Sequence, residues 1–334
     1  MLNFKGYVIF LTAFISTFFT DKDVTNYQSN YQLVNVDTVT LEEASLSSSL
    51  ELIVDKHFIV LDKDQGIIFY FDKTGALDKK IARKGRGPGE LLDPSSITLD
   101  SEKNLYVFDN SLMRINIYNS EGHYLKSIKA ENRAIDMKVS GDNIFTYNPF
   151  KEKNVSKYEI SDGKFIENFG SNSEVHKRLK TGFSSTFFRG INVINDTLYA
   201  LSHPYDFSIQ LFNLNGELIG RKKPTSTTFR PAEIPLNFNP FTDVNKMSDY
   251  VSNSVLKFYT GKRYIYFLIS DFSEDEKYLE IYDYEFAKIN TSKIPTGHNA
   301  LHAYDDDEKF FYSLIRSETD DFSLKIITSK LSIQ

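Results

Sequence analysis

Short polar residues recur at one place in a repeated pattern, which makes them the first candidates for chemistry. Asp62 ends the apolar run FIVLD, and Asp109, followed by Asn110, ends the matching run LYVFD. A ring of carboxylates around a channel would bind calcium or polarise water. The same side chains also cap turns by accepting hydrogen bonds from backbone amides. Because later copies carry Asn148 and Ser202 near this position, the pattern favours caps over a complete metal ring.

Histidines are the second set of candidate metal ligands. His298 and His302 are the closest pair in the sequence. Their surroundings predict a turn and then a strand, on which residues four apart share a face but lie about 13 Å apart. That separation is too large for a shared metal ion. We therefore expect no cofactor, and calcium or zinc in a channel is the alternative. His203, in the segment SHPYD, is predicted to lie exposed in a loop.

The glycine-rich segment GRGPGE, residues 85–90, has the composition of a phosphate-binding loop. It lacks the Gly-Lys-Ser/Thr ending of such a loop, and the segment after it is a predicted strand rather than a helix. The glycines are better explained by a tight crossing between two sheets. Arg86 and Glu90 would then face a channel mouth or pair with each other. The chain has no Cys and no GxSxG sequence, so the usual nucleophile motifs are missing.

These candidates are organised by an internal repeat. The two clearest copies cover residues 58–81 and 105–128, and each predicts a strand ending in Asp, a second strand, a turn with Gly and a third strand. Four weaker copies follow at residues 144–169, 198–222, 265–294 and 310–333. Repeats of roughly 40–50 residues that form four strands are typical of propeller blades. We predict an all-β, six-bladed β-propeller with four-stranded antiparallel blades.

The ends of the chain are predicted to close the ring. The last copy has material for strands only near residues 300–305, 309–316 and 322–328. The alternating segment 31–41 would supply its fourth strand and remove an exposed sheet edge. Two insertions interrupt the later copies, at residues 171–186 and 223–250. The second is either an ordered flap with a function or a cover for the apolar edge of a blade.

The first 30 residues are predicted to be a leader and a linker. Lys5 precedes an apolar run at residues 6–19, which is shorter than the roughly 20 residues that span a membrane. We therefore assign residues 1–20 to a signal peptide or membrane anchor, 21–30 to a linker and 31–334 to the propeller. Export to the periplasm, cell envelope or extracellular space is expected, and whether the leader is cut stays open.

One part of the sequence resembles a known family. The segments GRGPGE, PSSITLD, NLYVFDN, RINIYNSEG and YLKSI, up to residue 128, resemble NHL-type repeats, and most of all the exported six-bladed propellers of Bacteroides-like bacteria. The resemblance implies the fold and export, but no particular activity. The chain departs from many members of that family in having no Cys after the apolar leader.

The function expected from these features is binding rather than catalysis. Loops at one channel mouth would recognise a peptide, a protein partner or a carbohydrate, and the chain would be a monomer. The formal net charge of −6 argues against nucleic acid as a partner. The alternative is a calcium- or zinc-dependent hydrolase, lactonase or lyase with its metal in the channel. The predicted binding residues are Arg86, Glu90, Asn110, Arg114, Asn148, His203, Tyr205 and Arg230.

Overall fold

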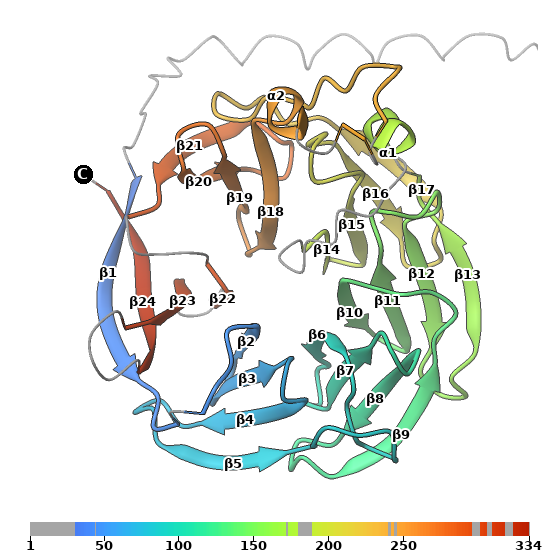
Figure 1. Ribbon diagram of the computed structural model, residues 1–334, viewed down its shortest axis with the longest axis vertical. Coiled ribbons are helices and arrows are strands. Elements are labelled where there is room, and N and C mark those ends of the chain that lie inside the picture. Colours follow the sequence, from blue (N-terminus) through green and yellow to red (C-terminus); the bar gives the residue numbers. More distant parts are fainter. Residues whose placement is uncertain are drawn as a thin grey trace, which may run out of the picture.

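The chain folds into a ring of six sheets around a central channel (Figure 1). The computed structural model describes residues 31–43, 45–171, 173–179, 189–239, 242–243, 246–295, 301–305, 309–317 and 323–333. Each sheet has four antiparallel strands, which confirms the predicted six-bladed β-propeller. The predicted leader and linker, residues 1–30, lie outside the described residues, as does His298. No helix within the described ranges is long and apolar enough to cross a membrane.

The first three blades follow the chain from the channel outward. Blade 1 contains β2 (Leu50–Val54), β3 (Phe58–Asp62), β4 (Ile67–Phe71) and β5 (Leu77–Ile81). Blade 2 contains β6 (Pro94–Leu99), β7 (Leu105–Asp109), β8 (Arg114–Tyr118) and β9 (Tyr124–Lys129). Blade 3 contains β10 (Asp136–Ser140), β11 (Asn143–Tyr147), β12 (Val155–Glu159) and β13 (Phe165–Phe169).

The last three blades complete the ring, and the innermost strands of neighbouring blades contact one another around the channel. Blade 4 contains β14 (Ile191–Ile194), β15 (Thr197–Leu201), β16 (Ile209–Asn213) and β17 (Leu218–Lys222). Blade 5 contains β18 (Asn253–Thr260), β19 (Ile265–Asp271), β20 (Glu276–Tyr282) and β21 (Lys288–Lys293). Blade 6 contains β22 (Ala303–Asp305), β23 (Phe310–Arg316), β24 (Leu324–Ile333) and β1 (Tyr31–Thr40).

Blade 6 joins the two ends of the described chain, as the sequence predicts. Strand β1 pairs antiparallel with β24 along its whole length, from Tyr31 opposite Ile333 to Thr40 opposite Lys325 (Figure 1). The same strand also reaches blade 5, where the Leu33 backbone N–H donates to Ser292 Oγ at 2.9 Å. Because β1 covers the outer edge of β24, that edge offers no free backbone groups to another chain.

The outer hairpins of the blades show how the repeat is encoded locally. In blade 1, Asp72 Oδ1 accepts hydrogen bonds from the backbone N–H groups of Thr74 and Ala76. Gly75 follows with φ of 92°, a conformation that residues with a side chain rarely adopt. A Cβ at Gly75 would lie 2.1 Å from the carbonyl oxygen of Thr40. Glycine therefore allows both the turn and the close passage of β1.

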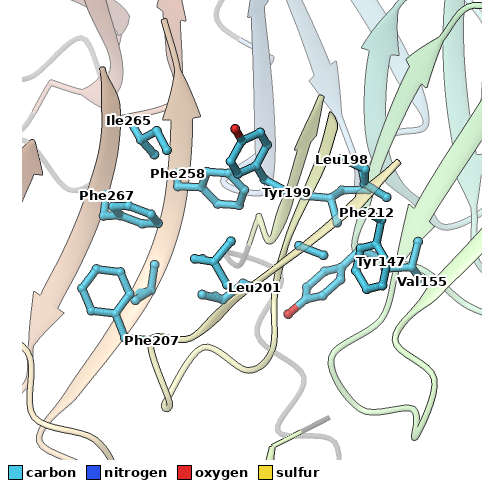
Figure 2. Close-up of a cluster of buried hydrophobic side chains, with 14 of the residues drawn as sticks. Tyr147, Val155, Leu198, Tyr199, Leu201, Phe207, Phe212, Phe258, Ile265 and Phe267 are labelled. Atoms are coloured by element: carbon cyan, nitrogen blue, oxygen red, sulfur yellow. The ribbon is translucent and has the colours of Figure 1, made fainter. Parts of the chain in front are cut away.

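The hydrophobic core lies between the blades rather than in one central mass. The largest cluster joins blades 3, 4 and 5, and Figure 2 shows Leu198 and Leu201 of blade 4 among aromatic rings of both neighbours. Phe207 and Phe267 pack edge to face with ring centroids 4.8 Å apart. Aromatic pairs in this geometry add to the free energy gained by burying their apolar surface. Each blade is thus stabilised mainly by its two neighbours.

The 223–250 insertion packs on the propeller together with two short helices that the sequence analysis did not predict. In Figure 1, helix α1 (Glu174–Leu179) lies near blade 4 and helix α2 (Met247–Tyr250) lies near blade 5. Ile234 of the insertion is buried against Tyr205 of blade 4. Arg178 Nη1 donates to the Ile234 carbonyl oxygen at 2.6 Å. The described part of the insertion therefore covers apolar surface of the blades, as one of the two predictions stated.

Candidate functional site

Two of the predicted binding residues, Arg86 and Glu90, belong to the glycine-rich link between blades 1 and 2, and a third, Arg114 of β8, binds to it. The Glu90 carboxylate accepts the Gly87 backbone N–H at 2.7 Å and pairs with Arg83 at 2.7 Å, instead of with Arg86. Arg114 Nη2 donates to the carbonyl oxygens of Gly87 and Glu90 at 2.6 and 2.8 Å. Arg86 is exposed. Glu90 and Arg114 thus hold the link together, and a part for any of the three in binding stays a prediction.

Two predicted asparagines bind the link between blades 2 and 3. Asn110 donates from Nδ2 to the Ala134 carbonyl oxygen and accepts the Ala134 N–H at Oδ1, both at 3.0 Å. Asn148 donates from Nδ2 to the Arg133 carbonyl oxygen at 3.0 Å and accepts the Phe150 N–H at Oδ1. Amide side chains suit this place because one end donates and the other accepts.

The exposure predicted for His203 is wrong, because its side chain is only 1% exposed. The imidazole packs between the rings of Phe150 and Tyr205, and its Nδ1 accepts the Tyr205 N–H at 3.3 Å. Tyr205 is buried as well, whereas Arg230 is exposed on the insertion. The loop SHPYD is folded inward because burying these rings against one another lowers the free energy more than leaving them in water.

The two strand-ending aspartates are caps, as predicted. Asp62 accepts the backbone N–H groups of Ser47 and Gln65 at 2.6 and 2.9 Å. Asp109 accepts those of Leu92 and Leu112 at 2.6 and 2.9 Å. Each carboxylate therefore fixes both its own turn and the link that enters its blade. Among the described residues, no three His, Asp or Glu side chains are grouped so that they could hold a metal ion.

The candidate site lies in the channel, away from all eight predicted residues. Two cavities of about 510 and 360 Å³ occur there. The cavity of about 510 Å³, which we call the upper cavity, lies where the inner strands begin. The cavity of about 360 Å³, the lower cavity, lies where they end. Both are lined by the same four residues, which we call the channel belt, namely Glu51, Arg189, Lys257 and His302. None of the eight predicted residues lines either cavity.

Arg189 connects the blades across the channel. Its guanidinium pairs with Glu51 of blade 1 through both Nε and Nη2. It also donates to the carbonyl oxygens of Ile135, before β10, and Ser95, on β6. The Arg189 backbone N–H donates to the Leu256 carbonyl oxygen of blade 5 at 2.8 Å. A planar guanidinium with five donors suits a position where several acceptors converge.

Irregularities in two inner strands bring these groups toward the channel. The register of β18 against β19 shifts between Val255 and Lys257, so that Leu256 is an extra residue in the strand. A similar shift between Pro94 and Ser96 makes Ser95 the extra residue in β6. A β-bulge of this kind redirects the groups beside it. The bulge in β6 therefore turns the Ser95 carbonyl toward Arg189. The bulge in β18 places Lys257 in the wall of both cavities.

The channel belt has one carboxylate, Glu51, for the two cations Arg189 and Lys257. Glu51 pairs with Arg189 and with Lys63, whose Nζ lies 3.2 Å from Glu51 Oε2. Burial alone would raise the pKa of Glu51, but the charges of Arg189, Lys63 and Lys257 outweigh it and lower the pKa to about 2. Burial lowers the pKa of Lys63 in spite of its partner. The only carboxylate of the belt is thus ionised and already shared by two cations.

Lys257 is the cation of the belt that forms no ion pair with a described carboxylate, although Glu51 and Asp136 are near enough to act on its charge. Its side chain is buried, and Nζ donates to the carbonyl oxygen of His302 at 3.2 Å. Among the described residues, no carboxylate lies within ion-pairing distance of Nζ. Burial and the nearby charge of Arg189 lower the pKa of Lys257 to about 7. A buried amine of this kind gains most from a ligand that brings a negative charge.

The sequence contains a signal for this site. Glu51 and Lys257 are the single charged residues of two otherwise uncharged strands, LELIV and NSVLKFYT. Asp136 begins the third inner strand and accepts the Ile191 N–H at 3.1 Å. A lone charge in an apolar inner strand must face either the channel or a partner, because the other face is packed against a neighbouring blade.

A closed ring of six blades around a lined channel defines the class of protein as a six-bladed β-propeller with two cavities in its channel. The chain belongs to the 6-bladed beta-propeller family DUF5128, whose model matches residues 35–320. Among proteins with curated functions, none matches the chain in sequence.

Solved structures with the same fold are distant in sequence. One is described as an exported protein from Bacteroides fragilis, with 16% identity over 93% of this chain and 98% of that one and a TM-score of 0.63. A second, from Bacteroides vulgatus, belongs to the DUF4221 family, with 13% identity, coverage of 92% and 100%, and a TM-score of 0.65. A third is virginiamycin B lyase from Staphylococcus aureus, with 11% identity, coverage of 92% and 98%, and a TM-score of 0.51. At these identities the similarity shows the fold alone.

Proposed function

We propose that this chain is an exported binding protein whose upper cavity takes an apolar organic carboxylate, such as the C-terminal end of an apolar peptide. The observation that carries the proposal is the buried amine of Lys257, which lines the cavity and has no carboxylate partner among the described residues. A ligand carboxylate would supply an ion-pair partner at a buried amine, where a charge-assisted hydrogen bond is stronger than in water.

The apolar part of the ligand is proposed from the rest of the cavity wall. Five leucines contribute to it, namely Leu50, Leu256, Leu268, Leu314 and Leu324. A cavity of about 510 Å³ is within the range of sites for small ligands, which usually combine an apolar wall with a few polar groups. Apolar side chains of a peptide would leave water on entering this space, and their burial would provide much of the affinity.

The charge of the wall also favours an anion over a cation. Beside Glu51, the upper cavity is lined by basic side chains from Lys63, Arg189, Lys257, Lys277 and Arg316. Arg316 donates to the carbonyl oxygens of Leu46 and Ser47 and so also fixes the link into blade 1. The local excess of positive charge contrasts with the acidic chain as a whole, and it would attract an anionic group into the channel.

Export is part of the proposal. It is supported by the apolar run at residues 6–19 and by the description of a structural relative as an exported protein.

A metal-dependent hydrolase or lyase is the second hypothesis, and elemental analysis of the purified protein tests it.

The test compares one peptide in two forms. Calorimetry would measure binding of an N-acetylated Leu-Leu-Val peptide with a free C-terminal carboxylate and of the same peptide as a C-terminal amide. We expect the amide to bind at least tenfold more weakly, because it cannot pair with Lys257. Lys257→Met should remove this difference. Equal binding of the two peptides, or a preference that survives Lys257→Met, would refute the proposal.

The matched control is Lys138→Met. Lys138 is a half-buried lysine that lines the lower cavity but not the upper one. The substitution removes the same charge from the same channel, so it should leave the preference for the carboxylate unchanged. Thermal unfolding of each variant would verify that the ring is intact.

A further inference from the structure

A third cavity, separate from the channel belt, lies between blades 5 and 6. Its volume is about 600 Å³, and we call it the side cleft. Its basic lining residues are Lys262, Arg263, Lys309 and Lys330, and the described residues that line it include no Asp or Glu. All four are exposed, so that their charges remain hydrated until a ligand approaches. This cluster would attract an anion to the cleft of an otherwise acidic chain.

Aromatic rings form the floor and walls of the side cleft. Tyr266 and Phe311 are buried beneath it, while Tyr31, Tyr264 and Tyr304 are half-buried along its walls. A cleft that combines half-buried tyrosines with cations offers flat apolar faces, hydroxyl groups and charge to one ligand.

The tilt of these rings restricts the kind of ligand. Tyr304 and Tyr266 are inclined by 49°, and Tyr264 and Tyr266 by 79°. The least inclined pair, Tyr304 and Phe311, still differs by 35°, so no two of these contacting rings are parallel and none of these pairs forms a slot for a flat nucleobase. A puckered sugar ring has apolar C–H faces and hydroxyl edges, and it can contact rings that are tilted in this way.

We infer that the side cleft binds an acidic oligosaccharide, with tyrosines against its sugar rings and Arg263 and Lys330 paired with its carboxylates or sulfates. Arg263 comes from the β18–β19 turn and Lys330 from β24, so the two cations reach the cleft from different blades. Charges on two sides favour a ligand with several anionic groups over a single free ion. This inference does not depend on the proposed ligand of the upper cavity.

The experiment uses the full chain and two oligosaccharides. Calorimetry would compare a tetrasaccharide of galacturonic acid with the neutral tetrasaccharide of galactose. We expect the acidic tetrasaccharide to bind at least tenfold more tightly. Arg263→Gln/Lys330→Gln should lose that preference, and Tyr264→Leu should weaken binding of the acidic form by about threefold or more. The control Lys129→Gln, which removes an exposed charge from β9 of blade 2, should change nothing.

Three results would overturn the inference. The first is absence of binding by the acidic tetrasaccharide, and the second is equal binding of both tetrasaccharides. The third is binding to vesicles of phosphatidylglycerol that depends on Arg263 and Lys330 while neither tetrasaccharide binds, because it would assign the cleft to a membrane surface instead. Unfolding temperatures of the variants would show whether a loss of binding comes from the cleft or from an unstable fold. If the double variant is unstable, binding by Lys330→Gln alone, at an exposed strand position, replaces it in the comparison.

Discussion

Arg189 and Glu51 join opposite sides of the ring through an ion pair across the channel. They belong to blades 4 and 1 and are 138 positions apart in the sequence. The same guanidinium reaches carbonyl oxygens beside and on the inner strands of blades 3 and 2. Inner strands that are otherwise held by contacts with their neighbours are thus also connected through the centre.

The first prediction concerns this connection. Arg189→Met should lower the free energy of unfolding by about 3–5 kcal/mol, because it leaves the buried Glu51 carboxylate with Lys63 alone and two carbonyl groups without their donor. Urea denaturation would measure the loss. Lys129→Met, at an exposed position, should change the free energy by less than about 0.5 kcal/mol. A loss of under about 1 kcal/mol for Arg189→Met would contradict a central role for this residue.

The second prediction concerns the pH dependence of stability. The pKa of Lys257 is about 7 in the folded chain, where it faces Arg189, Glu51, Lys63 and Asp136, and 10.5 is its ordinary value. Between these values the unfolded chain binds more protons than the folded one, so stability rises with pH. From pH 7 to pH 9, Lys257 should contribute roughly 2 kcal/mol to this rise.

The corresponding measurement is denaturation of the wild type and Lys257→Met at several pH values from 7 to 9. The variant should show a smaller rise, with part of the slope kept because burial also lowers the pKa of Lys63. Identical slopes for the two proteins would mean that Lys257 keeps its ordinary pKa.

The third prediction tests closure of the ring by β1. Leu33 is 1% exposed and packs against blade 5, whereas Val36 on the same strand is 42% exposed. Leu33→Ala should cost about 2–5 kcal/mol by leaving a cavity in the core. Val36→Ala removes methyl groups from the same strand and should cost less than about 0.5 kcal/mol. Similar losses for both would show that β1 is not anchored as described.

The fourth prediction separates structure from binding in the glycine-rich link. Arg114→Met should lower stability by about 2 kcal/mol, since it removes two hydrogen bonds from a charged donor to link carbonyls. Arg86→Met, at an exposed position of the same link, should leave stability unchanged. Both variants should bind the upper-cavity peptide within about twofold of the wild type. A tenfold loss of affinity for the peptide in either variant would show that the link takes part in binding.

The fold could be predicted because it is repeated in the sequence. Matching runs such as FIVLD and LYVFD show a strand and its cap at once, and the incomplete last copy indicates that segment 31–41 must close the ring. The outcome for β1 and for the caps at Asp62 and Asp109 confirms these arguments. The caps follow from a local sequence pattern, and the closure by β1 follows from the need to cover a sheet edge. Both features can be recognised in a single sequence.

The site was harder to predict because it is assembled from single residues of different blades. Whether Lys257 faces the channel depends on the bulge at Leu256, which shifts the alternation of the strand by one residue and has no clear sequence signal. Arg189 comes three positions after the end of the 171–186 insertion, where no strand pattern fixes the direction of its side chain. The exposure of His203 was mispredicted for a related reason, since a polar loop folds inward when aromatic residues accompany it.

The most direct test of a Lys257-centred site is the number of protons taken up when the Leu-Leu-Val carboxylate binds at pH 8. Calorimetry in two buffers of different ionisation enthalpy gives this number. With a pKa of about 7, Lys257 is mostly neutral at pH 8, and pairing with a carboxylate raises its pKa. We predict that the wild type takes up close to one proton and that Lys257→Met takes up none. Binding by the wild type without proton uptake would contradict the pairing of the ligand with Lys257.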